Sequence, residues 1–346
     1  MNTSNGNGLN HASKAGIITW ALLSARKIVI LLIAFGLGLE TFNWFIAFSH
    51  STNKFFSGSA LIFGIEKIIY AFFMFSICFR RDGYTDLVMH FESNAKIHLN
   101  HPSLEAYIKR NRYIFHLFTF VNFLILFSLA IVPLIVKLIE SNISTLDVLI
   151  FGSWHIGFCS LFALLRFFVE ACLYIHTCFI RVENQIDTLN NSSNALSIDD
   201  IRKVRRLYCF AVETTEKFNS LLWPVISTYF VVSIVNSHFA FARAITEPSF
   251  ALTMICFGEF SVFFLIAYNM IYINHLATRI YQSVYSLTYK TDSLFAKKEV
   301  QLFLTRIERA DVGFTFLDLF VITPTCVTSL ATISLTLGLA EPTLIK

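Results

Sequence analysis

Charged residues are scarce in this sequence. Asp, Glu, Lys and Arg make up only 14% of its 346 residues, whereas soluble domains average about 25%. Apolar residues make up 55%, and Phe alone occurs 38 times. So little charge excludes an ordinary soluble domain. The composition predicts an integral membrane protein, and we expect no nucleic-acid partner.

Sequence patterns for catalysis, metal binding and secretion are also missing. There is no metal-type Cys/His spacing, no His-Glu metal motif, no Gly-x-Ser-x-Gly and no pair of aspartates in facing spans. We therefore predict no enzymatic activity and no cofactor. None of the seven cysteines falls in a predicted outer loop, so no disulfide is expected. The polar residues 1–16 and the full length of the first apolar run predict that no signal peptide is cleaved.

Seven apolar runs are long enough to span a membrane. About 20 helical residues cross the roughly 30 Å of hydrocarbon in a bilayer. The fourth run exceeds that length, so its helix must tilt or project into water. The predicted spans, which make the fold class all-α membrane, are 28–48, 59–79, 113–136, 148–180, 221–241, 250–273 and 312–339.

The polar connectors between these spans also carry helical signals. Ser197 and Asp200 form a helix-start box in the connector 181–220. The connector 274–311 has apolar residues at helical spacing, which predict an amphipathic helix. They are Val300, Phe303, Leu304 and Ile307.

The distribution of Lys and Arg predicts the orientation. Of the 27 such residues, 21 lie in the N-terminal arm and in the connectors after the second, fourth and sixth spans. Only four lie in the other loops, at the edge of the fifth span and at the C-terminus. The positive-inside rule therefore places the N-terminus in the cytosol and the C-terminus outside. A G-protein-coupled receptor has the opposite orientation, so this class is excluded.

The last predicted span combines a hydroxyl face with apolar faces. Thr325, Ser329, Thr332 and Thr336 follow one another at i, i+4, i+7 and i+11, so they share one side of a helix. Such a polar stripe on a membrane helix is what a pore lining requires. The alternative is that these small residues only let helices pack closely and form hydrogen bonds across the bundle.

The layout of spans, together with the start of the last one, resembles the insect gustatory receptor family, the sister of the insect olfactory receptors. That family's last span begins with Gly, an aromatic residue and a Leu-Asp pair, matched here by Gly313-Phe314 and Leu317-Asp318. It then carries Thr-Tyr, five residues and Gln-Phe. This chain departs there, with Ala331-Thr332 and Gly338-Leu339 in those places.

The resemblance implies a ligand-gated cation channel in the plasma membrane, assembled as a homotetramer or heterotetramer. Each last helix would line a central pore, with Leu339 added to the hydroxyl stripe, and Asp318 would contact a cytosolic anchor. The ligand, a small tastant or odorant, would bind in the outer bundle of each subunit. The implied units are the arm 1–27, the bundle 28–273 with connectors 80–112 and 181–220, and the anchor and pore segment 274–346.

Ionisable and polar groups inside the spans are candidates for the ligand site, because such groups are costly in lipid. We expect several of them to converge with aromatic side chains on the outer half of the bundle. The alternative is that they form ion pairs that fix helix register, as we expect for Arg166 and Glu170 at i, i+4. The candidates are Glu66, Tyr70, Asn122, Trp154, His155, Phe158, Asn236, His238 and Glu259.

Two other functions are compatible with this sequence. A secondary transporter could use the same ionisable residues as a charge relay, but no internal repeat or pair of broken helices supports it. A non-conducting partner subunit would explain the incomplete C-terminal motif. The ligand-gated channel is the prediction that accounts for the hydroxyl stripe as well.

Overall fold

The computed structural model describes a chain built almost entirely from long helices. It covers residues 27–50, 54–79, 102–140, 144–193, 195–246, 250–309, 311–317, 319–329, 332–333 and 336. The long helices are α3 (Lys27–His50), α4 (Lys54–Phe79), α6 (Pro102–Ile139), α7 (Thr145–Asn191), α8 (Ile198–Thr246) and α9 (Phe250–Arg279). Shorter elements follow: α10 (Tyr281–Ser286), η1 (Leu287–Lys290), α11 (Leu294–Glu308), β1 (Thr315–Phe316) and β2 (Phe320–Val321).

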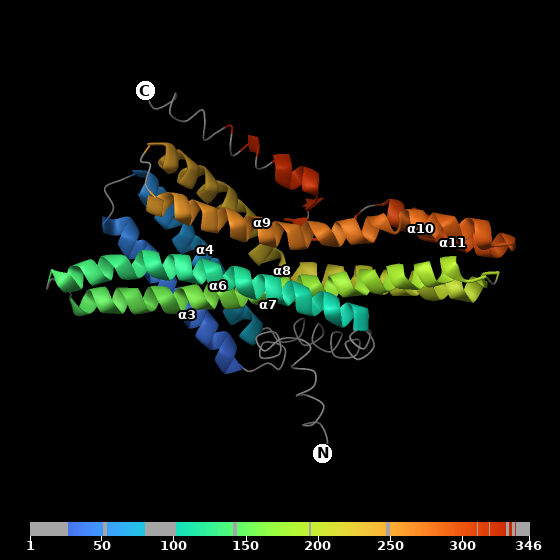
Figure 1. The fold of residues 1–346 in the computed structure, drawn as a ribbon, viewed down its shortest axis with the longest axis horizontal. Coiled ribbons are helices and arrows are strands. Elements are labelled where there is room, and N and C mark those ends of the chain that lie inside the picture. The colour runs from blue at the N-terminus through green and yellow to red at the C-terminus, as the bar shows by residue number, and fades with distance from the viewer. Residues whose placement is uncertain are drawn as a thin grey trace, which may run out of the picture.

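The helices α7 and α8 set the length of the molecule. Their 47 and 49 residues correspond to roughly 70 Å each at 1.5 Å per residue, more than twice the hydrocarbon thickness. In Figure 1, α7 runs along the long axis and the first half of α8 lies antiparallel beside it, whereas the second half of α8 slants away. The helices α3 and α4 cross α7 obliquely near the other end. The opposite ends of α7 and α8 lie beside α10 and α11. The predicted spans 148–180 and 221–241 are therefore parts of longer helices that continue into the polar connectors.

Four stretches are long and apolar enough to cross a membrane, counted over the described part of the chain. They are Ile28–Ser49, Thr145–Asn191, Ile198–Val235 and Phe260–Lys290. Many large apolar side chains of α3, α4 and α6, such as Phe35, Phe72 and Phe120, are exposed on the outside of the bundle. Such a surface suits lipid rather than water. The chain is thus a multi-pass membrane protein of all-α fold.

The helix signals of the connectors are confirmed. Ser197 precedes α8, where its hydroxyl accepts from the N–H of Asp200 at 3.2 Å while the Asp200 carboxylate accepts from the Ser197 N–H at 3.4 Å. In α11 the whole apolar stripe is buried: Val300, Phe303, Leu304 and Ile307 belong to the hydrophobic core. Glu299 on the same helix pairs with Arg205 of α8 at 2.7 Å. The end of the molecule away from α3 and α4 is therefore a packed helical layer.

The prediction of a helix starting at residue 312 is wrong. Residues 315–321 form a hairpin instead, in which β1 and β2 pair antiparallel with Thr315 opposite Val321 and Phe316 opposite Phe320. Leu317 at its tip has a positive φ of 51°, which is the left-handed conformation of tight turns. The last helix begins only at Pro324, where the Thr323 hydroxyl accepts from the Cys326 N–H at 3.3 Å. Asp318, which was expected to begin this helix, lies outside the described residues.

A buried ion triad joins α6 to α7. The Arg112 guanidinium donates to both oxygens of Glu170, with Nε–Oε1 and Nη2–Oε2 distances of 2.8 Å. Arg166 pairs with the same carboxylate, which confirms the predicted i, i+4 pair. Its guanidinium carbon lies 5.1 Å from the centre of the Phe115 ring. One carboxylate thus compensates two arginines inside the bundle.

We expect Glu170→Gln to destabilise the fold by roughly 3 kcal/mol or more, because it leaves the buried Arg166 and the partly buried Arg112 without their counter-charge. The matched control is Glu213→Gln on α8, which removes an exposed carboxylate paired only with Lys217 at i, i+4 and should cost less than about 1 kcal/mol. Thermal unfolding of the two purified variants in detergent measures the difference. Equal melting temperatures would show that the triad does not hold α6 against α7.

Candidate functional site

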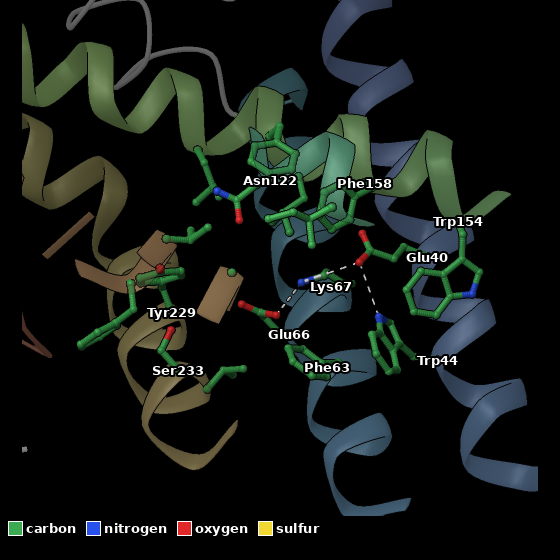
Figure 2. A pocket seen from close by; sticks show the side chains of 18 of the residues that line it. Glu40, Trp44, Phe63, Glu66, Lys67, Asn122, Trp154, Phe158, Tyr229 and Ser233 are labelled. Atoms are coloured by element: carbon green, nitrogen blue, oxygen red, sulfur yellow. Dashed lines mark hydrogen bonds and ion pairs between the residues drawn. The ribbon is translucent and has the colours of Figure 1, made fainter. Parts of the chain in front are cut away.

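A cavity of about 220 Å³ lies inside the bundle, between α3, α4, α6, α7, α8 and α9. Its lining residues fall in the C-terminal halves of α3, α6 and α8, in the middle of α4 and in the N-terminal halves of α7 and α9, and none belongs to α11. Its walls are mostly apolar, with a few polar groups reaching inwards (Figure 2). The lining includes Glu40, Trp44, Phe63, Glu66, Lys67, Asn122, Trp154, Phe158, Phe162, Tyr229, Ser233, Met254 and Phe263.

Three ionisable side chains meet at one side of this cavity (Figure 2). Lys67 and Glu66 are neighbours on α4, with their Nζ and Oε2 atoms 2.6 Å apart, and the same Nζ is 3.9 Å from Glu40 Oε1 on α3. All three are buried, with exposed fractions of 2% for Glu40, 4% for Glu66 and 3% for Lys67. The Tyr70 hydroxyl donates to Glu66 Oε1 at 2.8 Å. These contacts hold α3 against α4 at the wall of the cavity.

Aromatic rings surround the charged cluster. Trp44 stacks on Phe63 with 4.6 Å between ring centres and lies 4.8 Å from Trp154 of α7. The Trp44 indole N–H also donates to Glu40 Oε1 at 3.5 Å. Lys67 Nζ is 5.5 Å from the centre of the Phe63 ring. On the side formed by α8 and α9, Tyr229 stacks with Phe263 at 6.4 Å. A flat, apolar molecule would therefore meet ring faces on several sides.

Two glycines let α3 and α7 approach closely enough to hold Glu40 at the cavity. A Cβ atom on Gly157 would overlap the Cβ of Glu40 and come within 3.1 Å of the Gly36 carbonyl oxygen. A Cβ atom on Gly36 would overlap the Ser160 hydroxyl. Small residues at such crossings are typical of membrane helix pairs. The position of the Glu40 carboxylate is thus fixed by backbone contact as well as by its ion pair.

The structure brings four of the predicted ligand residues to the cavity: Glu66, Asn122, Trp154 and Phe158. Two other candidates do not line this cavity. Tyr70 does not line the cavity and instead supports Glu66 from behind. His155 points away, towards Phe151 and Phe127, with its Nδ1 at 2.7 Å from the Phe151 carbonyl. The side chains of Asn236, His238 and Glu259 lie outside the described part of the structure.

Several lining residues were not predicted from the sequence. Glu40 had the same signal as Glu66, an acidic residue inside an apolar span. Trp44 one helical turn further on shares its face, and this spacing could have identified the pair. Tyr229, Ser233 and Met254 carry no such signal, because ordinary packing residues and lining residues have the same composition.

The hydroxyl stripe of the last helix lies on the surface of the single subunit. Thr325, Ser329, Thr332 and Thr336 are all exposed, whereas Val327 on the opposite face is buried. The Thr332 hydroxyl donates to the Thr328 carbonyl at 2.9 Å, and that of Thr336 to the Thr332 carbonyl at 2.8 Å. Since their protons are engaged within the helix, these hydroxyls present oxygen lone pairs outwards. Leu339 lies outside the described residues.

Comparison with known proteins gives matches at the level of structure. No protein-family model and no curated protein matches the chain. The insect olfactory receptor OR5 from Machilis hrabei in complex with eugenol superposes with a TM-score of 0.64 at 14% identity, over 92% of this chain and 88% of that one. Another structure of OR5 gives a TM-score of 0.52 at 13% identity, over 91% and 87%. At this identity the likeness establishes the fold, over nearly the whole of both chains.

We expect Gly157→Ala to destabilise the protein by about 1–3 kcal/mol, as overpacking of a tight contact does, and to displace Glu40. The control is Gly152→Ala, one and a half turns earlier on α7, where an added Cβ meets nothing within 4 Å. Thermal unfolding gives the stability, and tryptophan emission reports the surroundings of Trp44 and Trp154. A Gly157 variant indistinguishable from the Gly152 variant would contradict the close crossing.

Proposed function

We propose that this protein is a chemosensory receptor of the insect gustatory and olfactory type, acting as a ligand-gated cation channel in the plasma membrane. A small organic molecule binds in the cavity of each subunit, and several subunits, four by resemblance, surround a pore lined by the last helix. The positive-inside distribution supports a cytosolic N-terminus and an α10–α11 layer on the cytosolic side. The cavity then lies in the outer half of the membrane.

The single observation that carries this proposal is the aromatic-lined cavity with converging polar groups, found inside a fold shared with a receptor solved with eugenol. A cavity of about 150 Å³ is enough to hold benzene, so about 220 Å³ suits a small substituted ring. The charged groups of the lining are paired with one another, Lys67 with Glu66 at 2.6 Å and with Glu40 at 3.9 Å, and such an arrangement suits the orientation of a bound molecule. These side chains therefore support the binding of a small molecule.

The outward hydroxyl stripe supports the pore. In a single subunit the stripe is a polar face on a membrane helix. Exposure of such a face to lipid costs free energy unless the face meets water or another protein surface. Copies of this helix arranged around an axis would bring the stripes together around water. Oxygen lone pairs pointing into that space favour cations over anions.

The helix α8 provides a connection between the cavity and the last helix. Its residues Tyr229 and Ser233 line the cavity. More than two turns before Tyr229, Asn219 holds Thr315 of the hairpin through two hydrogen bonds of 2.9 Å. Ser227, only two residues before Tyr229, accepts from the Leu317 N–H at 3.3 Å through its hydroxyl. The hairpin leads directly into the last helix. A ligand that favours one position of α8 would therefore bias the pore.

A non-conducting partner subunit is the alternative with a specific observation in its favour. The last helix lacks the Tyr and Gln that the resembling family carries in its C-terminal motif. Such a subunit would bind ligand in the same cavity and conduct only when combined with another chain. Expression of this chain alone separates the two functions.

We expect cells that express this chain alone to show a cation current evoked by small aromatic compounds, and Thr332→Trp to reduce it by at least about tenfold by filling the pore. The control Ile333→Trp places the same ring on the neighbouring exposed apolar face and should conduct like the wild type. Whole-cell recording with surface labelling measures both variants. A current that survives Thr332→Trp unchanged would exclude the stripe as the pore, and no current from surface-expressed protein would favour the partner subunit.

We also expect Asn219→Ala to separate binding from gating. Without the two bonds to Thr315, ligand affinity at the cavity should change less than about threefold, while the maximal current falls several-fold. Asn184→Ala, at an exposed position of α7, is the matched control. Ligand-induced quenching of tryptophan emission measures binding, and whole-cell recording measures gating. Equal losses in both would argue against coupling through the hairpin.

A further inference from the structure

The charged cluster at the cavity is unevenly balanced. Among the described lining residues, the ionisable groups that meet there are two carboxylates, Glu40 and Glu66, and one ammonium, Lys67. When each carries its ordinary charge, the cluster has a net charge of −1. A surplus charge in an apolar cavity is costly unless a bound partner compensates it.

The uncompensated negative charge belongs to Glu40 rather than to Glu66. Both oxygens of Glu66 are engaged, Oε1 by the Tyr70 hydroxyl at 2.8 Å and Oε2 by Lys67 at 2.6 Å. Lys67 is much farther from Glu40, at 3.9 Å from Oε1. The Trp44 N–H reaches the same oxygen at a long 3.5 Å. Glu40 thus holds only weak contacts, and all of them are on one oxygen.

The other oxygen of Glu40 has no hydrogen-bond partner among the described residues. Glu40 Oε2 is buried, and the side chain as a whole is 2% exposed. Figure 2 shows the carboxylate at the cavity wall, between the Lys67 ammonium and the rings of Trp44 and Trp154. A buried carboxylate oxygen costs its full desolvation when it is left unpaired. This atom therefore marks the place where a bound molecule would donate.

The surroundings of Glu40 favour a cation joined to a ring. Trp44 and Trp154 present aromatic surface next to the carboxylate, and tryptophan is the strongest aromatic partner for a cation. A primary ammonium donates up to three hydrogen bonds and restores the missing positive charge. The cavity of about 220 Å³ holds one substituted ring and a short side chain, because about 150 Å³ accepts benzene.

Resting on the function proposed above, we infer that the ligands of this cavity are small aromatic amines, bound as the ammonium ion with its N–H groups on Glu40 Oε2. The ring lies among Trp44, Trp154 and Phe158. Neutral alcohols of the same shape donate one uncharged hydrogen bond and bind more weakly. Carboxylates add to the surplus negative charge and are rejected.

The test compares three probes of nearly one shape on the full-length wild-type protein in lipid nanodiscs at neutral pH: 2-phenylethylamine, 2-phenylethanol and phenylacetate. Quenching of tryptophan emission measures binding without any need for conduction. A charged hydrogen bond in place of a neutral one predicts that the amine binds roughly 10- to 100-fold more tightly than the alcohol. Phenylacetate should bind most weakly. An alcohol that binds as tightly as the amine, or no binding of the amine up to about 1 mM, overturns the inference.

The variant Glu40→Gln keeps the shape of the side chain and its acceptor for Trp44, but removes the charge. It should lower the preference for the amine to about threefold or less, while the exposed Glu213→Gln control retains the full preference. A Glu40→Gln protein that keeps the wild-type preference contradicts the role of Glu40. If this variant fails to fold, the comparison of the three probes on the wild type still decides the ligand class.

Whole-cell recording with the same probes separates this inference from the proposed channel. Amine-selective binding without a current supports the ligand class and refutes a self-sufficient channel. A current evoked by the alcohol but not by the amine supports the channel and refutes the ligand class.

Discussion

Burial inside an apolar bundle obliges ionisable side chains to find partners, because an unpaired buried charge is costly. Two clusters show how the packing depends on this constraint. Glu170 of α7 accepts from Arg112 of α6 and from Arg166 of its own helix. Lys67 of α4 holds Glu66 and also approaches Glu40 of α3. The first cluster engages both oxygens of its carboxylate and leaves Arg166 Nη1 without a partner, whereas the second leaves Glu40 Oε2 without one, counted over the described residues. Of the two residues, only Glu40 lines the cavity, so its unpaired atom is the one that a bound molecule could reach.

Helix positions could be predicted from the sequence much better than helix rotations. Apolar runs have a length that the bilayer dictates, so the long helices fall where hydropathy places them. Which side of a helix faces the cavity depends on neighbours far away in the chain. Glu66 and His155 were equally plausible as inward-facing residues, yet Glu66 lines the cavity and His155 packs against Phe151. Close crossings such as Gly157 against Glu40 settle these rotations, and they involve pairs that local patterns do not reveal.

The hairpin before the last helix shows a second limit of prediction. Its residues Phe316, Phe320 and Val321 continue the apolar run, so hydropathy alone extends the helix back to residue 312. The informative signal was Thr323-Pro324, because proline is favoured in the first turn of a helix and Thr commonly caps its start. A helix that begins at Pro324 still contains the whole hydroxyl stripe. The segment before Pro324 is then not helical, and it forms hydrogen bonds with α8 instead.

This arrangement separates a stable layer from a part that can respond to ligand. The α11 end is packed by apolar residues such as Phe303 and Ile307, and nothing in it needs to change when the cavity fills. Among the described residues of the last helix, Val327 is buried against the bundle and most others are exposed. The position of this helix therefore depends mainly on the hairpin, and the hairpin depends on Asn219 and Ser227 of α8. Pro224 lies between these two residues and removes one backbone hydrogen bond from α8. In the proposed channel, a helix weakened at that point would transmit a small rotation from Tyr229 at the cavity to the base of the last helix without disturbing the packed layer.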